Sequence, residues 1–319
     1  MSIATTRLAP SPTGALHLGN ARTFLLTWLL ARRNGWRVVL RIEDLDGPRV
    51  KAGADRQAID DLRWLGLDWD EGPTYQSPRQ GAYDAALAML LASGAGYPCV
   101  CTRREVELAA SAPHAEDGAS VYPGTCRGRF ASVEAARDFA GRTPAIRFRM
   151  PEGELAYHDE FRGPQRVNPA RALGDFVIAK ADGTAAYQLA VVIDDAEAGV
   201  TDVVRGDDLL DSTPRQILLY RALGLGEQVP RYWHLPLVVG PDGRRLAKRH
   251  GDTRLAHYRD KGVPPERILA LLARWSGISA EHPAAPGALV PHFDIARVPR
   301  GQVQFTPADD AWLTALPAG

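Results

Sequence analysis

The alternation of short apolar segments with longer helix-like segments is the property of this sequence that most limits its fold. A Pro- and Gly-rich turn separates the first short strand from an apolar helix that Gly35 is predicted to end, and a buried strand follows. The elements predicted in this way are strands at 7–9, 38–42, 187–193 and 201–205 and helices at 20–34 and 265–276. Such alternation is typical of an α/β protein with a mostly parallel sheet.

Two further helices are indicated by matching start signals. Ser77-Pro78-Arg79-Gln80 and Thr213-Pro214-Arg215-Gln216 each offer an N-cap hydroxyl, a proline at the first helical position and a capping-box glutamine. Gly94 and Gly224 are predicted to close these two helices.

The segment between Gly96 and Pro169 interrupts this rhythm, because it holds all three cysteines and shows no strand–helix period. We interpret it as an insertion between two halves of one catalytic domain. The divisions predicted are residues 1–96 for the first half, 97–168 for the insertion, 169–238 for the second half, and 239–319 for a loop, a helix and a tail on the surface.

Composition limits the class of protein. No apolar stretch approaches the roughly 20 residues that a membrane helix needs, and the N-terminus lacks a signal-peptide core, so we expect a cytoplasmic protein without membrane association. The 38 basic residues balance the 38 acidic ones, so any RNA contact must come from a local patch.

Residues 9–20, Ala-Pro-Ser-Pro-Thr-Gly-Ala-Leu-His-Leu-Gly-Asn, follow the first predicted strand and open a helix. Such a turn presents backbone N–H groups and the positive end of a helix dipole to an anion. Gly14 and Gly19 would let phosphate and adenine approach the backbone, and His17 adds a donor that can follow charge developing on phosphate. The alternative is that His17 only caps the helix.

Residues 243–252, Gly-Arg-Arg-Leu-Ala-Lys-Arg-His-Gly-Asp, form a basic segment between glycines. A mobile cationic loop of this kind can hold a triphosphate and neutralise the leaving pyrophosphate. Taken alone, a solvated basic turn is the favoured interpretation.

The cysteines indicate a metal rather than disulfides, because their number is odd and Cys99 and Cys101 are one residue apart. With Cys126 they suit a structural Zn²⁺ that stiffens an insertion too small for its own core. General rules leave the fourth ligand open, with His114 as the ordinary choice. Three reduced cysteines without a metal are the alternative.

Together, the turn at 9–20 and the basic loop resemble the HIGH and KMSKS signatures of class I aminoacyl-tRNA synthetases. Segments 41–46, 187–195 and 204–210 are similar to the glutamyl branch of that class, and all five run in family order over roughly residues 5–275. The resemblance implies a Rossmann-type doubly wound parallel sheet, a zinc-containing insertion and a C-terminal helical, stem-like region.

The resemblance also implies roles for individual residues. Those matched to the glutamate pocket are Arg7, Ala9, Ser11, Glu43, Tyr187 and Arg205. Those matched to ATP are Thr13, Gly14, His17, Gly19, Asn20 and Lys248, with His17 and Lys248 as the catalytic pair. Chemistry agrees, because glutamate carries two carboxylates and one ammonium and so requires two arginines and one acid. For Arg205, a structural salt bridge with Asp207 or Asp208 is the alternative.

Two positions depart from the family pattern. Asn20 stands where HIGH ends in His, and Ala247 stands where KMSKS has its Ser, but Lys248 is present and we expect activity. A subset of glutamyl-type synthetases carries C-x-C followed by Y-x3-C, and this resemblance selects Tyr122 as the fourth zinc ligand beside Cys99, Cys101 and Cys126.

The short distance from the basic loop to Gly319 predicts that no anticodon-binding domain follows. With the zinc spacing, this resembles the glutamyl-queuosine tRNA(Asp) synthetases, which attach activated glutamate to the wobble queuosine of tRNA(Asp). The resemblance implies L-glutamate and ATP with Mg²⁺ as substrates, the tRNA(Asp) anticodon stem-loop as partner, and a monomer. The alternatives are a truncated glutamyl-tRNA synthetase that charges the acceptor end, and a catalytically silent nucleotide- or RNA-binding module.

Overall fold

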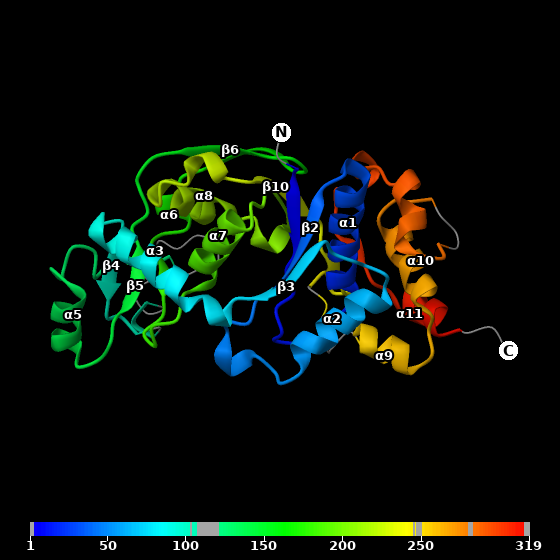
Figure 1. The fold of residues 1–319 in the computed structure, drawn as a ribbon, viewed down its shortest axis with the longest axis horizontal. Helices are drawn as coiled ribbons and strands as arrows, with labels where there is room; N and C mark the ends of the chain where they lie inside the picture. Colours follow the sequence, from blue (N-terminus) through cyan, green and yellow to red (C-terminus); the bar gives the residue numbers. More distant parts are fainter. Residues whose placement is uncertain are drawn as a thin grey trace.

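The computed structural model describes residues 3–102, 104–106, 121–244, 246, 251–279 and 283–315. Figure 1 shows an elongated arrangement in which the strands β1, β2 and β3 lie between two helical ends. The end near α5 (Val133–Ala140) comes from the middle of the chain, and the opposite end carries α10 (Pro265–Trp275) and α11 (Pro307–Thr314).

The first half of the catalytic core is a parallel three-stranded sheet in the order β1-β2-β3. Its strands are β1 (Thr5–Leu8), β2 (Arg37–Ile42) and β3 (Glu71–Tyr75), and Thr5 pairs with Arg37 in register. The crossover from β1 to β2 is helix α1 (Leu18–Asn34), which ends at Gly35 in the left-handed conformation, with φ of 65°. The predicted helix and buried strand are confirmed, because the glycine stop and the apolar run are both strong local signals.

The second sheet has the order β7-β6-β10-β9. Its strands are β7 (Gly163–Val167), β6 (Leu155–Asp159), β10 (Arg231–Leu235) and β9 (Asp202–Gly206). β6, β10 and β9 are parallel and β7 is antiparallel, so the sheet is mixed rather than wholly parallel. β9 lies against β1, where the Thr201 backbone N–H donates to the Thr5 carbonyl over 2.9 Å. The carboxyl ends of β1 and β9 therefore meet, which is where α/β sheets bind ligands.

The cysteine-containing segment forms an antiparallel sheet of its own, with the order β4-β5-β8. Its strands are β4 (Gly96–Cys99), β5 (Ala145–Phe148) and β8 (Phe176–Ala179), with α5 and the short helix α6 (Pro169–Ala172) nearby in sequence. Strands β6 and β7 also lie within 97–168, but they belong to the second sheet, where β7 pairs with β6 and β6 pairs with β10. Hydrogen bonding between strands distant in sequence therefore links the inserted segment to the second half of the core.

One predicted strand is a helix. Residues 187–193 belong to α7 (Tyr187–Glu197), in which every residue from Leu189 to Asp195 is buried. A helix covered on all sides loses the one-sided apolar stripe that identifies amphipathic helices. Its run of Leu, Ala, Val and Ile therefore has the composition of a buried strand, and the prediction was wrong for that reason.

The two proline-marked helix starts also differ from the prediction. Ser77 lies in a 3-10 turn before α3 (Gln80–Ala92), and its Oγ donates to Asp44 Oδ2 over 2.6 Å. Thr213 lies inside α8 (Ser212–Ala222), where its Oγ accepts from Arg205. Neither hydroxyl caps its helix, because each is used in a tertiary contact.

The tail beyond Gly277 contributes to the core instead of lying on the surface. It contains β12 (Val303–Gln304), which pairs with β11 (Val238–Val239), and helix α11. Leu289, Phe293 and Leu313 are buried at 0%, 1% and 0% exposure. The predicted helix at 265–276 is confirmed as α10, and α9 (Leu255–Asp260) precedes it.

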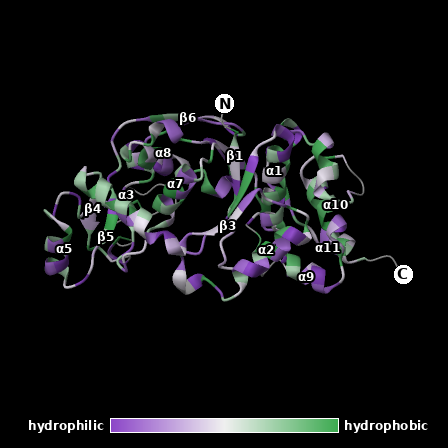
Figure 2. Ribbon diagram, viewed as in Figure 1, coloured by the Kyte–Doolittle hydropathy of each residue, from purple (hydrophilic) through white to green (hydrophobic). Residues whose placement is uncertain are grey.

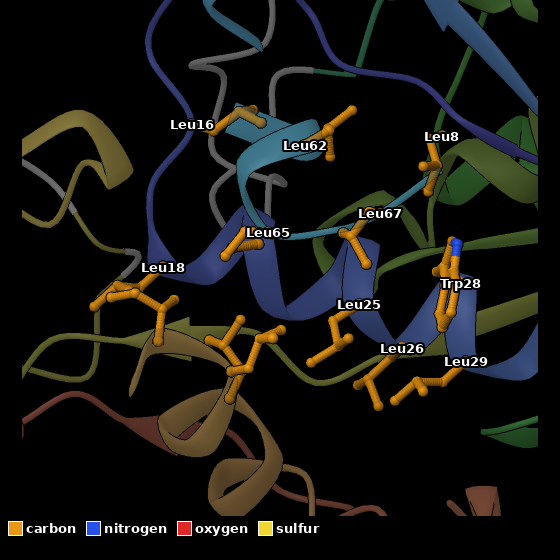
Figure 3. Close-up of a cluster of buried hydrophobic side chains, with 14 of the residues drawn as sticks. Leu8, Leu16, Leu18, Leu25, Leu26, Trp28, Leu29, Leu62, Leu65 and Leu67 are labelled. Atoms are coloured by element: carbon orange, nitrogen blue, oxygen red, sulfur yellow. The ribbon is translucent and has the colours of Figure 1, made fainter. Parts of the chain in front are cut away.

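The largest apolar cluster forms around α1. Figure 3 shows this cluster, which includes Leu25, Leu26 and Leu29 of α1 and Leu62 and Leu67, which lie in and after α2 (Ala54–Trp64). Figure 2 shows hydrophobic residues along α1 and α10, which face each other within this cluster. Each fully buried leucine contributes about 1.5–3 kcal/mol, so this cluster holds α1 and the turn before it in place.

Among the helices of the described residues, none combines the length and the apolar character required to cross a bilayer.

Candidate active site

A cleft of about 640 Å³ opens where the carboxyl ends of β1, β2 and β9 meet the start of α1. This is the topological position at which parallel sheets bind ligands. Its lining includes the predicted residues Arg7, Ala9, Ser11, Thr13, Gly14, His17, Gly19, Asn20, Glu43, Tyr187 and Arg205. Residues predicted from the turn at 9–20, from the strand before it and from the segments 41–46, 187–195 and 204–210 therefore share one cavity.

His17 is the N-cap of α1. Its Nδ1 accepts the backbone N–H groups of Gly19, over 3.1 Å, and of Asn20, over 3.4 Å, while Asn20 Oδ1 accepts the His17 N–H. An imidazole that accepts at Nδ1 carries its proton at Nε2 in the neutral form, so the ring presents a defined donor. His17 thus caps the helix, as the alternative interpretation predicted, and it also lines the cleft.

The two glycines of the turn differ in what surrounds them. A Cβ at Gly19 would lie 2.9 Å from Cε1 of His17, so Gly19 leaves room for the histidine ring rather than for a nucleotide alone. A Cβ at Gly14 would meet nothing within 4 Å. The space beside Gly14 is therefore open for a ligand to approach the backbone.

The floor of the cleft carries buried opposite charges. Arg7, 5% exposed, donates through Nη1 to the Val204 carbonyl and lies 3.4 Å from Asp195. Arg41 contacts Asp195 over 2.6 Å and Glu43 over 3.1 Å, so these charges form one network. Burial raises the pKa of Glu43 above its usual value, although Arg41 and Arg7 oppose that shift.

Arg205 is held by neutral acceptors instead of carboxylates. Its Nε donates to His234 Nε2 over 2.9 Å, Nη1 donates to Gln216 Oε1 over 2.9 Å, and Nη2 donates to Thr213 Oγ1 over 2.8 Å. The alternative salt bridge to Asp207 or Asp208 is absent from the described residues, where Asp207 pairs with Arg162. Among the described residues, the Arg205 guanidinium in the cleft wall is therefore paired with no carboxylate.

The basic loop leaves β11 at the cleft and returns beside the His17 turn. The Leu18 N–H donates to the Thr253 carbonyl over 3.0 Å, and the Leu255 N–H donates to the Leu16 carbonyl over 2.9 Å. Arg245 and residues 247–250, which include Ala247 and Lys248, lie outside the described residues. The two ends of the loop are thus anchored at the mouth of the cleft.

Four groups meet in the inserted segment. The Sγ atoms of Cys99, Cys101 and Cys126 lie within 4.8 Å of one another, and Cys101 and Cys126 are separated by 3.5 Å, too far for a disulfide. The Tyr122 hydroxyl lies 3.4 Å from the sulfur of Cys99 and 3.5 Å from that of Cys101. Bonds of about 2.3 Å to a tetrahedral Zn²⁺ place neighbouring sulfurs about 3.8 Å apart, so this cluster fits such an ion.

One cation, Arg147, lies against this cluster. Arg147 Nε donates to Cys99 Sγ over 3.3 Å, and its guanidinium carbon lies 3.8 Å from the centre of the Tyr122 ring. Without an ion, burial raises the pKa of Cys101 to about 11, and a metal would reverse that shift by favouring the thiolate. The alternative ligand His114 lies outside the described residues.

Sequence reasoning missed the buried residues that support the cleft. Arg41, Asp195 and His234 have exposures of 3%, 2% and 0%, and each lies in a strand or helix that is largely buried. A charged or imidazole side chain in an apolar run was the available signal, because buried polar groups require partners.

Comparison with known proteins agrees with this geometry. Residues 4–284 match the family model described as tRNA synthetases class I (E and Q), catalytic domain. A glutamyl-Q tRNA(Asp) synthetase of Symbiobacterium thermophilum is 53% identical over 98% of both chains, and one of Rhodopirellula baltica is 52% identical over 89% of this chain and 88% of that protein.

Glutamate–tRNA ligases are similar over part of their length. Glutamate–tRNA ligase 1 of Halorhodospira halophila is 46% identical, with 95% of this chain matching 65% of that protein. The crystal structure of a glutamate tRNA ligase from Elizabethkingia meningosepticum, in complex with its amino acid, superposes with a TM-score of 0.82 at 30% identity, covering 98% of this chain and 69% of that one. These similarities show that the chain belongs to the class I tRNA synthetases for E and Q, within the glutamyl-Q tRNA(Asp) synthetase family, and that it is a ligase-type enzyme.

Proposed function

We propose that the cleft activates glutamate with ATP and that the protein transfers the glutamyl group to queuosine at the wobble position of tRNA(Asp). The observation that carries this proposal is the charge pattern of one cavity, which combines Arg7, Glu43 and Arg205 with the His17 turn. The names of the relatives that match along nearly the whole chain support the choice of tRNA substrate.

Glutamate would be recognised by charge complementarity. Two arginines and one carboxylate match the two carboxylates and one ammonium of the amino acid. We assign the ammonium to Glu43, and the side-chain carboxylate to Arg205, because Arg205 has no carboxylate partner in the described structure whereas Arg7 lies beside Asp195. Tyr187 complements the same pocket, with Ala9 and Ser11 along its edge.

ATP would lie along the turn at residues 9–20. The start of α1 offers backbone N–H groups and a positive dipole to phosphate, and the open space at Gly14 admits the nucleotide. Thr13, Gly19 and Asn20 complete this wall, and His17 supplies its Nε2 proton to the charge that develops on phosphate. Lys248 would reach the phosphates from the loop whose ends are anchored beside that turn.

The activation step requires no protein nucleophile. The glutamate α-carboxylate oxygen attacks the α-phosphorus, the bond to the bridging oxygen breaks, and glutamyl-adenylate and pyrophosphate form. A hydroxyl of queuosine then attacks the acyl carbon, and AMP leaves. The protein contributes orientation and charge stabilisation, and Mg²⁺ would accompany the nucleotide to neutralise its phosphates.

We also propose that Cys99, Cys101, Tyr122 and Cys126 hold one structural Zn²⁺. The ion would stiffen the inserted segment, whose local apolar cluster consists largely of the ligands themselves. The further proposals are a monomer that acts in the cytoplasm and contacts the anticodon stem-loop of tRNA(Asp), where queuosine resides.

The test measures transfer of labelled glutamate to tRNA in the presence of ATP and Mg²⁺. Two tRNA(Asp) pools are compared, identical except that one contains queuosine and the other guanosine at the wobble position. Label confined to the queuosine pool supports the proposal. Equal labelling of both pools indicates acceptor-end charging, and no labelling of either indicates a silent binding module.

A further inference from the structure

Arg205 in the cleft wall and two residues behind it form a chain of hydrogen bonds whose donor-to-acceptor direction is fixed from one end to the other. Arg205 Nε lies 2.9 Å from His234 Nε2, and His234 Nδ1 lies 2.6 Å from Asp159 Oδ2. Arg205 and His234 are paired neighbours on β9 and β10, so both side chains lie on the same side of the sheet. Asp159 ends β6, which pairs with β10.

The direction follows from the chemistry of arginine. A guanidinium only donates, so His234 Nε2 must accept and must carry no proton. The neutral ring then carries its proton at Nδ1, which donates to Asp159. Burial lowers the pKa of His234 below its usual value, in keeping with a neutral ring at physiological pH.

Asp159 is suited to hold that tautomer. Its Oδ1 accepts three backbone N–H groups, from Phe161 over 3.1 Å, from Arg162 over 2.6 Å and from His234 over 3.3 Å. Its Oδ2 is left to face the imidazole. Asp159 and His234 are each 0% exposed, so water does not substitute for either contact.

We propose that Asp159 and His234 are positioning residues for glutamate recognition: the Asp159 carboxylate selects the Nδ1–H tautomer of His234, and His234 Nε2 then fixes the plane of the Arg205 guanidinium. This inference rests on the proposed role of Arg205 in binding the glutamate side chain. A bidentate pair between arginine and carboxylate requires the guanidinium plane to be held in one orientation. Neither positioning residue lines the cleft.

The substitution Asp159→Asn tests the direction of the chain. The three backbone N–H groups require an acceptor and hold the amide oxygen of the new side chain at the Oδ1 position, so its NH2 group faces His234. His234 Nδ1 must then accept, and the ring proton moves to Nε2. That proton faces the Arg205 Nε–H and competes with Arg205 for the Thr213 oxygen, which lies 3.3 Å from Nε2.

We expect Asp159→Asn to raise the KM for glutamate roughly 10- to 100-fold, the size of effect expected from a lost hydrogen bond to a charged group. The KM for ATP should change less than threefold. The matched control is Asp175→Asn, which alters a buried carboxylate that accepts from Tyr97, Arg127 and the Met150 N–H in the inserted segment. Asp175→Asn should leave the KM for glutamate unchanged.

A second substitution separates positioning from general damage. In His234→Gln, the side-chain oxygen can occupy the place of Nε2 and accept the Arg205 Nε–H. This contact does not depend on whether residue 159 is an aspartate or an asparagine. The double variant Asp159→Asn/His234→Gln should therefore bind glutamate better than Asp159→Asn alone. A purely structural role predicts no recovery, because the second substitution would remove a further native contact from the same buried network.

The readouts are steady-state transfer of glutamate to queuosine-containing tRNA and ¹⁵N NMR of histidine-labelled protein, which distinguishes the two tautomers without reference to activity. Support consists of an Nδ1–H signal for His234 in the wild type, an Nε2–H signal in Asp159→Asn, and partial recovery in the double variant. An unchanged KM for glutamate in Asp159→Asn, or an Nε2–H signal in the wild type, overturns the inference. A wild type that transfers no glutamate would refute the proposed function, whereas the NMR result would still decide the tautomer.

Discussion

Replacing Glu43 by glutamine removes one charge from the cleft and little else. The Glu43 side chain is 12% exposed, lines the cavity and accepts from Arg41 over 3.1 Å. Arg41 keeps its 2.6 Å contact with Asp195, so the buried network and the fold should persist. The variant is isosteric, and its defect should appear in ligand binding.

The expected loss of glutamate binding follows from the charged residues that line the cleft. Arg7, Arg205 and Glu43 together match the charges of glutamate, and Glu43→Gln leaves the ammonium without the carboxylate assigned to it. Loss of a charge-assisted hydrogen bond costs about 1.5–3 kcal/mol, which corresponds to roughly a 10- to 150-fold rise in the KM for glutamate, at 1.4 kcal/mol per factor of ten.

The assay is steady-state transfer to queuosine-containing tRNA with glutamate varied at saturating ATP, and then with ATP varied. The matched control is Glu71→Gln, which removes a carboxylate from an exposed pair with Arg37 at 3.2 Å, where about 0–1 kcal/mol of stability is at stake. Thermal unfolding checks that both variants fold. A wild-type KM for glutamate in Glu43→Gln would refute the assignment of the ammonium to this carboxylate.

Three further outcomes are expected. Because the proposed contact with the glutamate ammonium requires the ionised form of Glu43 and burial raises its pKa, the kcat/KM for glutamate should fall on acidification at a higher pH than for an ordinary carboxylate, and this limb should be missing from the pH profile of Glu43→Gln. Cys99→Ser and Tyr122→Phe should each lower bound zinc measured by atomic emission and lower the midpoint of thermal unfolding, whereas full zinc content in Tyr122→Phe would remove the tyrosine from the ligand set. Leu25→Ala should cost about 2–5 kcal/mol in denaturant unfolding, because the side chain is 0% exposed within the apolar cluster around α1, and a loss under 1 kcal/mol would show that this cluster does not hold α1 in place.

Local signals in the sequence were sufficient for the elements that carry the motifs. The turn at 9–20, the glycine stop at Gly35 and the apolar strand at 38–42 predicted the β1–α1–β2 unit, and the structure confirms it. The Cys99 and Cys101 spacing predicted a metal-type cluster, and the sulfurs of all three cysteines gather as expected. These features depend on backbone conformation and spacing, which the chain encodes over a few residues.

Features that depend on burial were decided by tertiary structure alone. α7 was mistaken for a strand because the core covers it on all sides, and Ser77 and Thr213 were mistaken for caps because distant residues use their hydroxyls. The tail packs into the core through β12 and α11, which its Pro- and Ala-rich composition did not indicate.

The candidate site divides in the same way. The identities of Arg7, Glu43 and Arg205 were predictable from motifs, because a ligand's charges dictate the residue types that bind it. Their orientation was not, because it depends on Asp195 and on the Asp159–His234 pair, which come from other strands and helices. A sequence therefore determines which charged side chains reach the cleft. Their orientation is fixed only in the folded protein, where strands far apart in the chain bring hydrogen-bond donors and acceptors together in a place that excludes water.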